Sequence, residues 1–330
     1  MKRTVRDWMR ATAIALPNFD GYADWEPALH RWAPALGDVR VVGLGEATHG
    51  TREFFQLKAL MVRYLVERAG FRVFALEAPG KPAPAVNAYI QGDAVDPVAA
   101  LTGLASWPWR TEEVLALLEW MRSYNQSCPA SERVRFIGVD PLDPDLFTDV
   151  PETPRTEEAA AESFWAVRDR QMAEAILEAA ANDKVVFWGH NGHVGMEPFL
   201  PGAPTTGQVL REKLGTSYYA VGLLFGRGSL RAFRSEPTNA GEPDIVHRGR
   251  PVPWSAEAAL GRALGTAHLL DLRAAPPDAA RWLGEQRWVG GFGADSPRWP
   301  ILSFNITRLA TAYDAIAYLP TSSPSRPLPK

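Results

Sequence analysis

The sequence predicts an α/β protein with a mainly parallel central sheet flanked by helices. Short runs rich in valine and phenylalanine recur along the chain, and amphipathic helical patterns separate the early ones. Strand, helix and strand at this spacing indicate parallel βαβ units. With 330 residues, of which 46% are hydrophobic and 22% charged, the chain is long enough for one sizeable core. We therefore expect a single domain over residues 1–330.

The candidate strands are short apolar runs. After a basic residue in the first or second position, the first four are apolar or glycine almost to their ends, as expected for strands buried on both faces of a sheet. They lie at 39–45, 71–77, 134–140 and 184–190. Four more candidates follow at 217–225, 230–234, 268–273 and 313–319.

Three helices are predicted from periodicity and end signals. The segment 51–70 places its apolar residues on one stripe, with Thr51 at the N-cap position and Gly70 at the stop. The segments 111–124 and 157–182 show similar patterns. These helices are expected to cover the faces of the sheet.

Two connections differ from the rest in composition. The segment 79–110 is rich in proline, glycine and tryptophan, and the segment 141–170 begins with a proline-rich stretch. We expect both to rise over the carboxyl edge of the strands as lids. The tail, 320–330, is expected to be extended or frayed.

Charge and composition exclude several classes of protein. The formal net charge is −3 and the arginines form no basic stripe, so we expect no nucleic-acid partner. No run of about 18 apolar residues predicts a membrane span, and charges interrupt the apolar stretch near the N-terminus that a signal peptide would need. The single cysteine, Cys128, forms no disulfide framework. These features favour a cytoplasmic protein without a nucleic-acid or membrane partner.

The first four predicted strands all end in side chains that can do chemistry. The carboxyl ends of parallel strands lie along one edge of a sheet, where α/β proteins build their sites. We therefore expect these side chains to converge in one cleft. They are Glu46, His49, Glu77, Asp140, His190 and His193.

Each of these residues also has a structural role open to it. Glu46 and His49 could serve a helix terminus, and Asp140 could cap a turn. Glu77 follows a buried run, where a salt bridge is its main alternative role. The two histidines of the GHNGHVG loop could stand on a surface turn.

The chemistry that fits this set best is activation of water. A neutral imidazole oriented by a carboxylate can take a proton from water and contributes about 10²–10⁴-fold in rate. Donors that stabilise an oxyanion add about 10²–10³-fold, and the amides near His190 and the second imidazole, His193, are candidates. The Lys-Ser/Thr pair of a phosphate loop, a G-x-S-x-G elbow and an H-E-x-x-H motif are all missing from the sequence. The sequence therefore favours ester hydrolysis without a covalent nucleophile.

Several of these stretches together resemble the erythromycin esterase family. They are GLGEATHGTREFF, WRTEEVLALLEWMRSYN, FIGVD, RDRQMAEAI, VVFWGHNGHVG and YDAIAYLP, and they occur in the order of that family. The resemblance spans residues 37–328. It implies a hydrolase that opens macrolide lactones by general-base attack of water, without metal or cofactor. His49 would be the base, Glu46 and Glu77 would orient it, and His190 and His193 would position water or the carbonyl.

The resemblance also indicates residues near the substrate. Lys58 falls where macrolide esterases often carry a basic residue, and Arg168 lies in a segment that resembles a family motif, where Ala175 replaces the usual asparagine. Asp140, at a strand end, is a further candidate. Trp109, in the first lid connection, is a candidate wall of an apolar pocket, although core packing is its alternative. The departures from the family pattern leave the natural substrate open.

Two other functions remain open at this stage. Glu46, His49, Glu77, His190 and His193 are ligand types for zinc or iron, so a metal- or haem-binding protein is the main alternative. A binding module without catalytic activity is the third.

Overall fold

The structure is a computed structural model, and it describes residues 1–19, 21–142, 163–198, 202–234, 242–296 and 303–329. Its main sheet runs in the order β1-β8-β12-β6-β2-β5-β3-β4. Six neighbouring strands of this path are parallel: β12 (Ala315–Ser322), β6 (Tyr218–Arg234), β2 (Val41–Leu44), β5 (Lys184–Trp188), β3 (Phe71–Pro79) and β4 (Arg135–Asp140). The predicted α/β fold with a mainly parallel sheet is thus confirmed.

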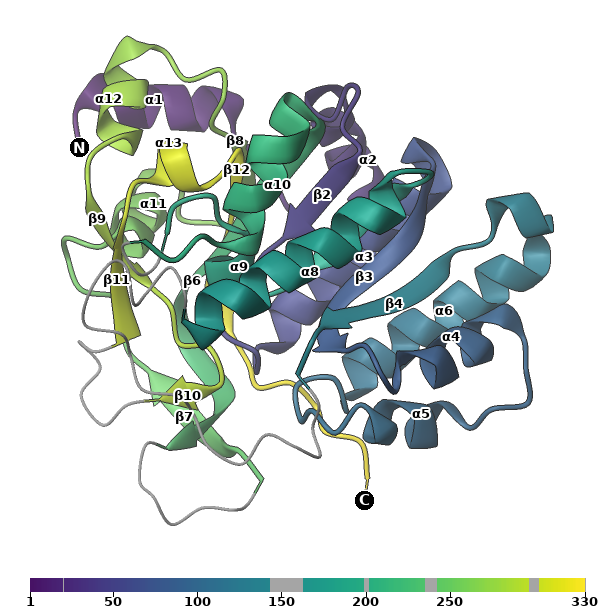
Figure 1. The fold of residues 1–330 in the computed structure, drawn as a ribbon. Coiled ribbons are helices and arrows are strands. Elements are labelled where there is room, and N and C mark those ends of the chain that lie inside the picture. The colour runs from purple at the N-terminus through teal and green to yellow at the C-terminus, as the bar shows by residue number, and fades with distance from the viewer. Residues whose placement is uncertain (20, 143–162, 199–201, 235–241, 297–302, 330) are drawn as a thin grey trace.

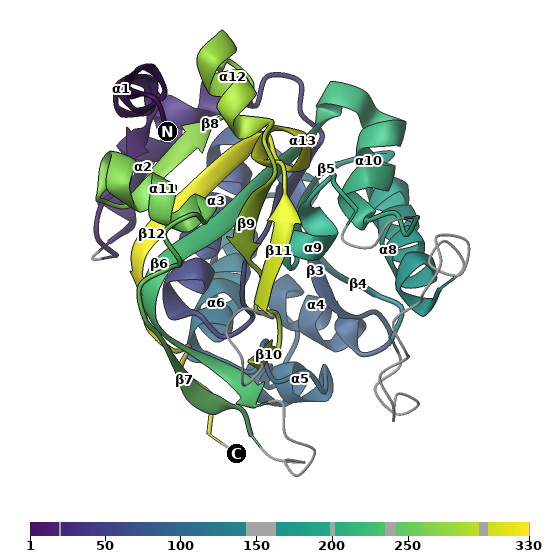
Figure 2. The same cartoon turned by 90° about the vertical axis from the view of Figure 1, so that its left-hand side faces the viewer.

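The remaining strands lie at one end of the sheet or beside its long strand. β8 (His268–Asp271) and β1 (Ile14–Ala15) extend the sheet beyond β12 by antiparallel pairing. β7 (Asp244–Arg248) and β10 (Asp295–Ser296) pair with the far half of β6, which Figure 2 shows running past the body of the sheet. β9 (Arg287–Gly290) and β11 (Phe304–Thr307) form a separate antiparallel pair.

Helices cover both faces of the sheet (Figure 1). One face carries α2 (Tyr22–Trp32), α3 (Arg52–Ala69), α4 (Ala83–Gln91), α5 (Pro97–Gly103) and α6 (Glu112–Ser127). The other face carries α1 (Arg3–Thr12), α8 (Phe164–Ala180), α10 (Thr206–Leu214), α11 (Ala256–Leu264) and α12 (Pro277–Leu283). The short helices α9 (Asn191–Val194) and α13 (Leu309–Ala312) follow β5 and precede β12.

The central strands are buried on both faces, as their continuous hydrophobicity predicts. Val42 and Leu44 of β2 face the core under α3, while Val41 faces the core under α8. Each such side chain stabilises the fold by about 1.5–3 kcal/mol relative to exposure. The two cores fix the sheet between its helical layers and so fix the positions of the strand ends.

The helix α3 forms as its sequence predicts. Thr51 has the extended backbone of an N-cap, although its side chain makes no capping hydrogen bond. Gly70 ends the helix with φ of 73°, a left-handed conformation that glycine adopts without the steric cost of a Cβ atom. Because α3 begins directly after the loop that carries His49, this helix holds that loop against the sheet.

One segment differs from expectation, and the two proposed lids stay predictions. The candidates at 217–225 and 230–234 form one strand, β6, because Gly228 allows the backbone to pass Ser322 at a distance that a Cβ atom would not permit. The segment 79–110 contains α4 and α5, which pack beside α6. The proposed lid over 141–170 lies outside the described residues for 143–162, and α8 begins at Phe164.

The tail after β12 is extended and docked on the protein. Ser325 N donates to Gly50 O at 2.9 Å and Leu328 N to Arg110 O at 3.1 Å. Ser323 N donates to Glu53 at 2.7 Å. These hydrogen bonds therefore hold the tail against the start of α3. Across the described part of the chain, the helices are all too short or too polar to cross a membrane.

Candidate active site

Four adjacent parallel strands bring the predicted site residues to one edge of the sheet. The strands are β2, β5, β3 and β4, in that order across the sheet. Since all four run in the same direction, their carboxyl ends lie side by side. Hydrogen bonds and ion pairs join the side chains at this edge into two connected groups.

The first group is a chain of three side chains that ends at His49. Glu46 Oε1 lies 2.7 Å from His49 Nδ1, and Glu46 Oε2 accepts a hydrogen bond from Lys58 Nζ. Glu46 and Lys58 have no exposed side-chain surface, whereas the His49 side chain is 13% exposed. The carboxylate therefore holds the imidazole through Nδ1 from the buried side, and the ring keeps some contact with solvent.

Lys58 holds the Glu46 carboxylate from the core side by a buried ion pair. Its ammonium lies 4.1 Å from the centre of the Trp188 ring, which favours the cation. Burial lowers the pKa of Lys58 to about 8, although the Glu46 carboxylate opposes this shift. The Lys58 side chain is fully buried and its ammonium is bonded to Glu46, so Lys58 has no exposed surface at this site.

The second group is centred on Arg168. Arg168 binds Asp140 in a bidentate manner, with Nε–Oδ1 at 3.0 Å and Nη2–Oδ2 at 2.8 Å, and Nη2 also donates to Glu77 Oε1 at 3.1 Å. Burial opposes ionisation of Glu77, but His193, His49 and Arg168 hold its pKa well below the usual range. Asp140 and Arg168 are at most 8% exposed and are bonded to one another. They thus form a buried charged pair beside Glu77.

His193 joins this second group through both ring nitrogens. Nδ1 lies 2.8 Å from Asp169 Oδ1, and Nε2 lies 3.2 Å from Glu77 Oε1. Burial opposes protonation, but the carboxylates of Asp169 and Glu77 outweigh it and raise the pKa of His193 to about 10. The ring is therefore an imidazolium at neutral pH. Arg168 Nη1 also lies 2.9 Å from His193 Nε2. The two groups are held close together because Arg168 Nη2 and His193 Nε2 both contact Glu77 Oε1.

His190 has the opposite protonation state. Its backbone N–H donates to Glu77 Oε2 at 2.6 Å, and its Nδ1 accepts a hydrogen bond from Gly192 N at 3.1 Å. Burial and the nearby His49 lower the pKa of His190 to about 3. The neutral ring thus carries its proton on Nε2. Among the described residues this buried Nε2 has no hydrogen-bond partner, and the ring lies 5.2 Å from that of His49.

Trp109 forms an apolar wall beside the base. Its ring meets that of His49 edge to face at 6.0 Å between centroids and also contacts Phe55 and Trp188. Trp109 is only 1% exposed. It is thus a core residue that also packs against the His49 ring.

Sequence reasoning missed two parts of this site. Asp169 holds the His193 ring and also accepts hydrogen bonds from the backbone N–H and the hydroxyl of Thr206, both at 2.7 Å. Gly293 O accepts a hydrogen bond from His49 N at 3.1 Å, and Phe292 N donates to Ala47 O at 2.7 Å. The only signals in the sequence were the charged RDR stretch and the glycine-rich GGFGADS stretch.

The ligand types named for a metal do not form a metal site here. Within the ranges that the structure describes, no three His, Cys, Asp or Glu side chains are placed to hold a metal ion together. The carboxylates Glu46 and Glu77 are instead bonded to Lys58 and Arg168, and the imidazoles to carboxylates or backbone. The geometry thus gives no support to the metal- or haem-binding alternative.

A parallel α/β sheet with carboxylates and imidazoles gathered at its carboxyl edge is the arrangement of an enzyme of the α/β class. The family follows from the sequence. The model of the erythromycin esterase family matches residues 66–150 and 146–322, so the chain belongs to this family. Membership supports a hydrolase.

Two curated relatives match shorter segments. Erythromycin esterase type II of Escherichia coli is 32% identical over 121 residues, which are 37% of this chain and 27% of that protein. YbfO of Bacillus subtilis (strain 168), which bears the name of a hydrolase, is 34% identical over 92 residues, 28% of this chain and 20% of that protein. The chain therefore matches about a quarter of the length of the first relative and a fifth of the second.

Solved structures share the fold over nearly the whole chain. A Bacillus cereus protein has a TM-score of 0.82 at 22% identity, with 99% of each chain covered. A succinoglycan biosynthesis protein has a TM-score of 0.81 at 22% identity, with 99% of this chain and 98% of that chain covered. A mutant of the erythromycin esterase EreC in its open conformation has a TM-score of 0.67 at 18% identity, covering 94% and 98%.

Proposed function

We propose that this protein hydrolyses a carboxylic ester or lactone by general-base attack of water. His49 is the base, and neither a covalent nucleophile nor a metal takes part. The single observation that carries the proposal is the chain Lys58–Glu46–His49, which runs from the core to a partly exposed imidazole. The names of the erythromycin esterases among its relatives support the same reaction class.

The first step follows from the protonation of the His49 ring. Glu46 on Nδ1 selects the tautomer that carries its proton on Nδ1, so the lone pair of the ring stands on Nε2, the nitrogen that Glu46 does not bind. This nitrogen takes a proton from water as the water oxygen attacks the ester carbonyl. The imidazolium that results is stabilised by Glu46. The ring then returns the proton to the leaving alcohol oxygen, which restores the base.

His190 is the proposed donor to the oxyanion. Its low pKa keeps it neutral, and its buried Nε2–H makes no hydrogen bond of full geometry to a described residue, although the Ala47 backbone lies near enough to the ring to oppose the fall in pKa. A donor held in place before the reaction costs no reorganisation when negative charge develops. Glu77 and His193 support this loop, since Glu77 accepts the backbone N–H of His190 and pairs with the imidazolium of His193. We therefore assign positioning roles to Glu77, His193, Asp140 and Arg168.

The substrate of the proposed reaction is an ester or a macrolide lactone. Apolar rings near the base, such as Trp109, suit an apolar acyl or alcohol part. A panel of macrolides and of simpler aryl and alkyl esters, followed by mass spectrometry for the addition of water, identifies the class.

The test of the base is the substitution His49→Ala. We expect kcat/KM for the best ester of the panel to fall by about 10²–10⁴-fold, with the unfolding midpoint unchanged. The matched control is His247→Ala, because His247 is an exposed histidine on β7, outside the cluster. Turnover by His49→Ala at the wild-type rate would refute the assignment.

A second measurement tests hydrolysis without a metal. Protein purified without added metal is assayed with and without a chelator, and its metal content is measured. We expect equal rates. A stoichiometric metal whose removal abolishes turnover would favour the metalloenzyme alternative instead.

A further inference from the structure

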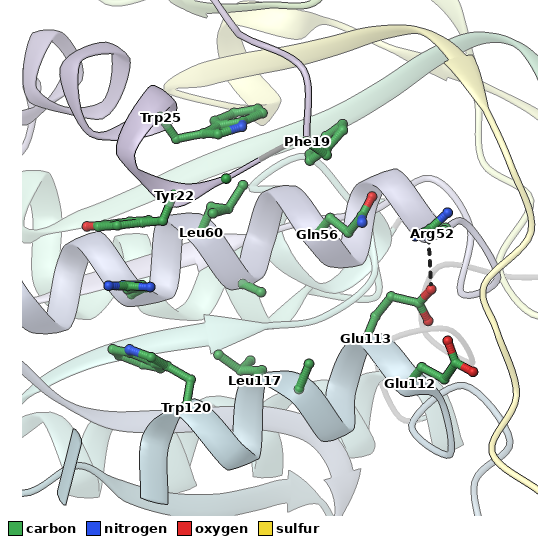
Figure 3. Close-up of a pocket in the computed structure, with 14 residues that line it drawn as sticks. Phe19, Tyr22, Trp25, Arg52, Gln56, Leu60, Glu112, Glu113, Leu117 and Trp120 are labelled. Atoms are coloured by element: carbon green, nitrogen blue, oxygen red, sulfur yellow. Dashed lines mark ion pairs between the residues drawn. The ribbon is translucent and has the colours of Figure 1, made fainter. Parts of the chain in front are cut away.

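A hollow of about 390 Å³ lies over α3, between α2 and α6, and shares no lining residue with the acid–imidazole cluster. Figure 3 shows Phe19, Tyr22 and Trp25 on one side of α3 and Trp120 of α6 on the other. The volume falls within the range of small-molecule sites, about 300–1,000 Å³. Neither the proposed function nor the comparisons assign a role to this hollow.

The walls of the hollow suit a flat apolar body. Phe19 and Trp25 stack, with ring centroids 5.0 Å apart at an interplanar angle of 29°. At one end, the guanidinium of Arg63 lies over the Tyr22 ring at 3.8 Å and 5.8 Å from that of Trp120. The charge of Arg63 is already balanced by Glu67, at 2.9 Å. This end therefore offers ring faces rather than a free charge.

The other end presents two polar atoms without hydrogen bonds. Arg52 Nε and Glu113 Oε1 are 3.4 Å apart, as the dashed line in Figure 3 marks, but they do not reach hydrogen-bond geometry. Both atoms are buried, and apart from this ion pair neither has a hydrogen-bond partner among the residues described. The Glu113 side chain is 5% exposed, and its second oxygen accepts a hydrogen bond from Arg326 N at 3.1 Å. A buried polar atom without a partner costs about 1–3 kcal/mol, so a ligand that satisfies both atoms gains from this end.

The charges at this end select a neutral ligand group. The unpaired atoms are one donor and one acceptor, on side chains of opposite charge. An ammonium would be repelled by Arg52, and a carboxylate by Glu113. A hydroxyl or primary amide donates to Glu113 Oε1 and accepts from Arg52 Nε at once, without adding charge.

We propose that this hollow is a second binding site, which takes a neutral, flat aromatic molecule bearing a hydroxyl or primary amide group. The aromatic body lies between the rings of α2 and α6 along α3. The polar group sits between Arg52 and Glu113. Binding here does not depend on hydrolysis at His49.

The probe for this site is 2-naphthol, measured by isothermal titration calorimetry on the full chain. We expect 1:1 binding with a Kd on the order of 10⁻⁴–10⁻³ M, as for a small ligand of this size. 2-Methoxynaphthalene lacks the donor and is expected to bind about tenfold more weakly, because a buried hydrogen bond to a charged acceptor is lost. 2-Naphthoate and 2-(aminomethyl)naphthalene carry the two charges and are expected to bind more weakly than 2-naphthol.

Matched variants locate the binding. Ala116→Trp on α6 and Ala59→Trp on α3 place a ring in the hollow and are expected to weaken 2-naphthol binding at least tenfold. Glu119→Trp adds the same ring to the exposed surface of α6 outside the lining, and its affinity is expected to match that of the wild type. His49→Ala should also leave the affinity unchanged. Circular dichroism confirms that each variant is folded.

Three results would overturn the proposal. They are the absence of saturable 2-naphthol binding, unchanged affinity in both folded variants that fill the hollow, and loss of binding in His49→Ala. The last of these would place 2-naphthol in the catalytic cluster instead. Because binding is measured without turnover, a failure of the hydrolase proposal leaves this test intact.

Discussion

Replacing Lys58 by methionine removes the cation that balances Glu46. Both side chains have no exposed surface, and the ammonium of Lys58 also lies on the Trp188 ring, 4.1 Å from its centre. Methionine keeps an unbranched apolar stem in this space. The variant therefore tests the charge and leaves the packing nearly intact.

The expected cost follows from the burial of the pair. Removing one partner of a buried ion pair destabilises a protein by about 3–5 kcal/mol, because the remaining charge stays in a low-dielectric interior or must take up a proton. Unfolding entropy scales with chain length, so for 330 residues this loss corresponds to a fall in Tm of about 4–7 °C. Removing the other partner of the pair by Glu46→Gln is expected to lower the free energy of unfolding less. Burial already lowers the pKa of Lys58 to about 8, so a lysine without its partner can release its proton near neutrality.

The assay is urea unfolding at pH 7 of the wild type, both single variants and the double variant. The double variant has neither charge of the pair, so no buried charge is left without its partner. We therefore expect it to recover most of the unfolding free energy lost in Lys58→Met, with a coupling free energy of several kcal/mol between positions 58 and 46. If Lys58→Met lies within about 1 kcal/mol of the wild type, Lys58 does not support Glu46 in the way proposed. Additive losses in the double variant would refute the reasoning in a second way.

Three further outcomes are expected. His193→Gln should destabilise the protein most below pH 6.5 and progressively less as the pH rises towards 10. The reason is that folding raises the pKa of His193 from 6.5 to about 10. A difference in unfolding free energy between the wild type and this variant that does not vary with pH would contradict the prediction. Gly50→Ala should destabilise by about 3 kcal/mol or more, since its Cβ atom would lie 1.9 Å from Arg231 O, and a thermal melt equal to that of the wild type would show that the loop can shift. Deleting the tail 323–330 should lower both the Tm and the esterase rate, whereas a rate like that of the full chain would show that the tail does not brace the His49 loop.

The central fold could be predicted because its signal is local. Continuous apolar runs mark the buried strands at 41–44, 71–79, 135–140 and 184–188. The point at which a strand ends has a weaker signal in the sequence than the strand itself. The sequence predicted two strands at 217–225 and 230–234, but the glycines between them serve the close passage of β6 along β12. That passage depends on a partner about 90 residues away, which no local pattern contains.

The candidate site was predictable in part for the same reason. Side chains directly after the central strands must lie at one edge, which brought Glu46, Glu77 and His190 together. Asp169 was missed because it stands within a helix, and only the packing of α8 against α10 brings it to His193. The contact of the 47–49 loop with Phe292 and Gly293 joins segments more than 240 residues apart. Such pairings follow from tertiary packing and have no signature in the sequence.

The three histidines of the site differ in which ring nitrogens remain free, and this difference supports the choice of His49 as the base. Both ring nitrogens of His193 face carboxylates, and its raised pKa keeps it protonated near neutrality, so it has no lone pair to offer water. His190 is neutral, but the Gly192 amide occupies its Nδ1, which leaves only a proton on Nε2. It can donate to an oxyanion but cannot accept from water. His49 alone of the three has a carboxylate on one nitrogen, a second nitrogen that Glu46 does not occupy and a ring in contact with solvent. A base that exchanges a proton with water in every turnover requires that combination.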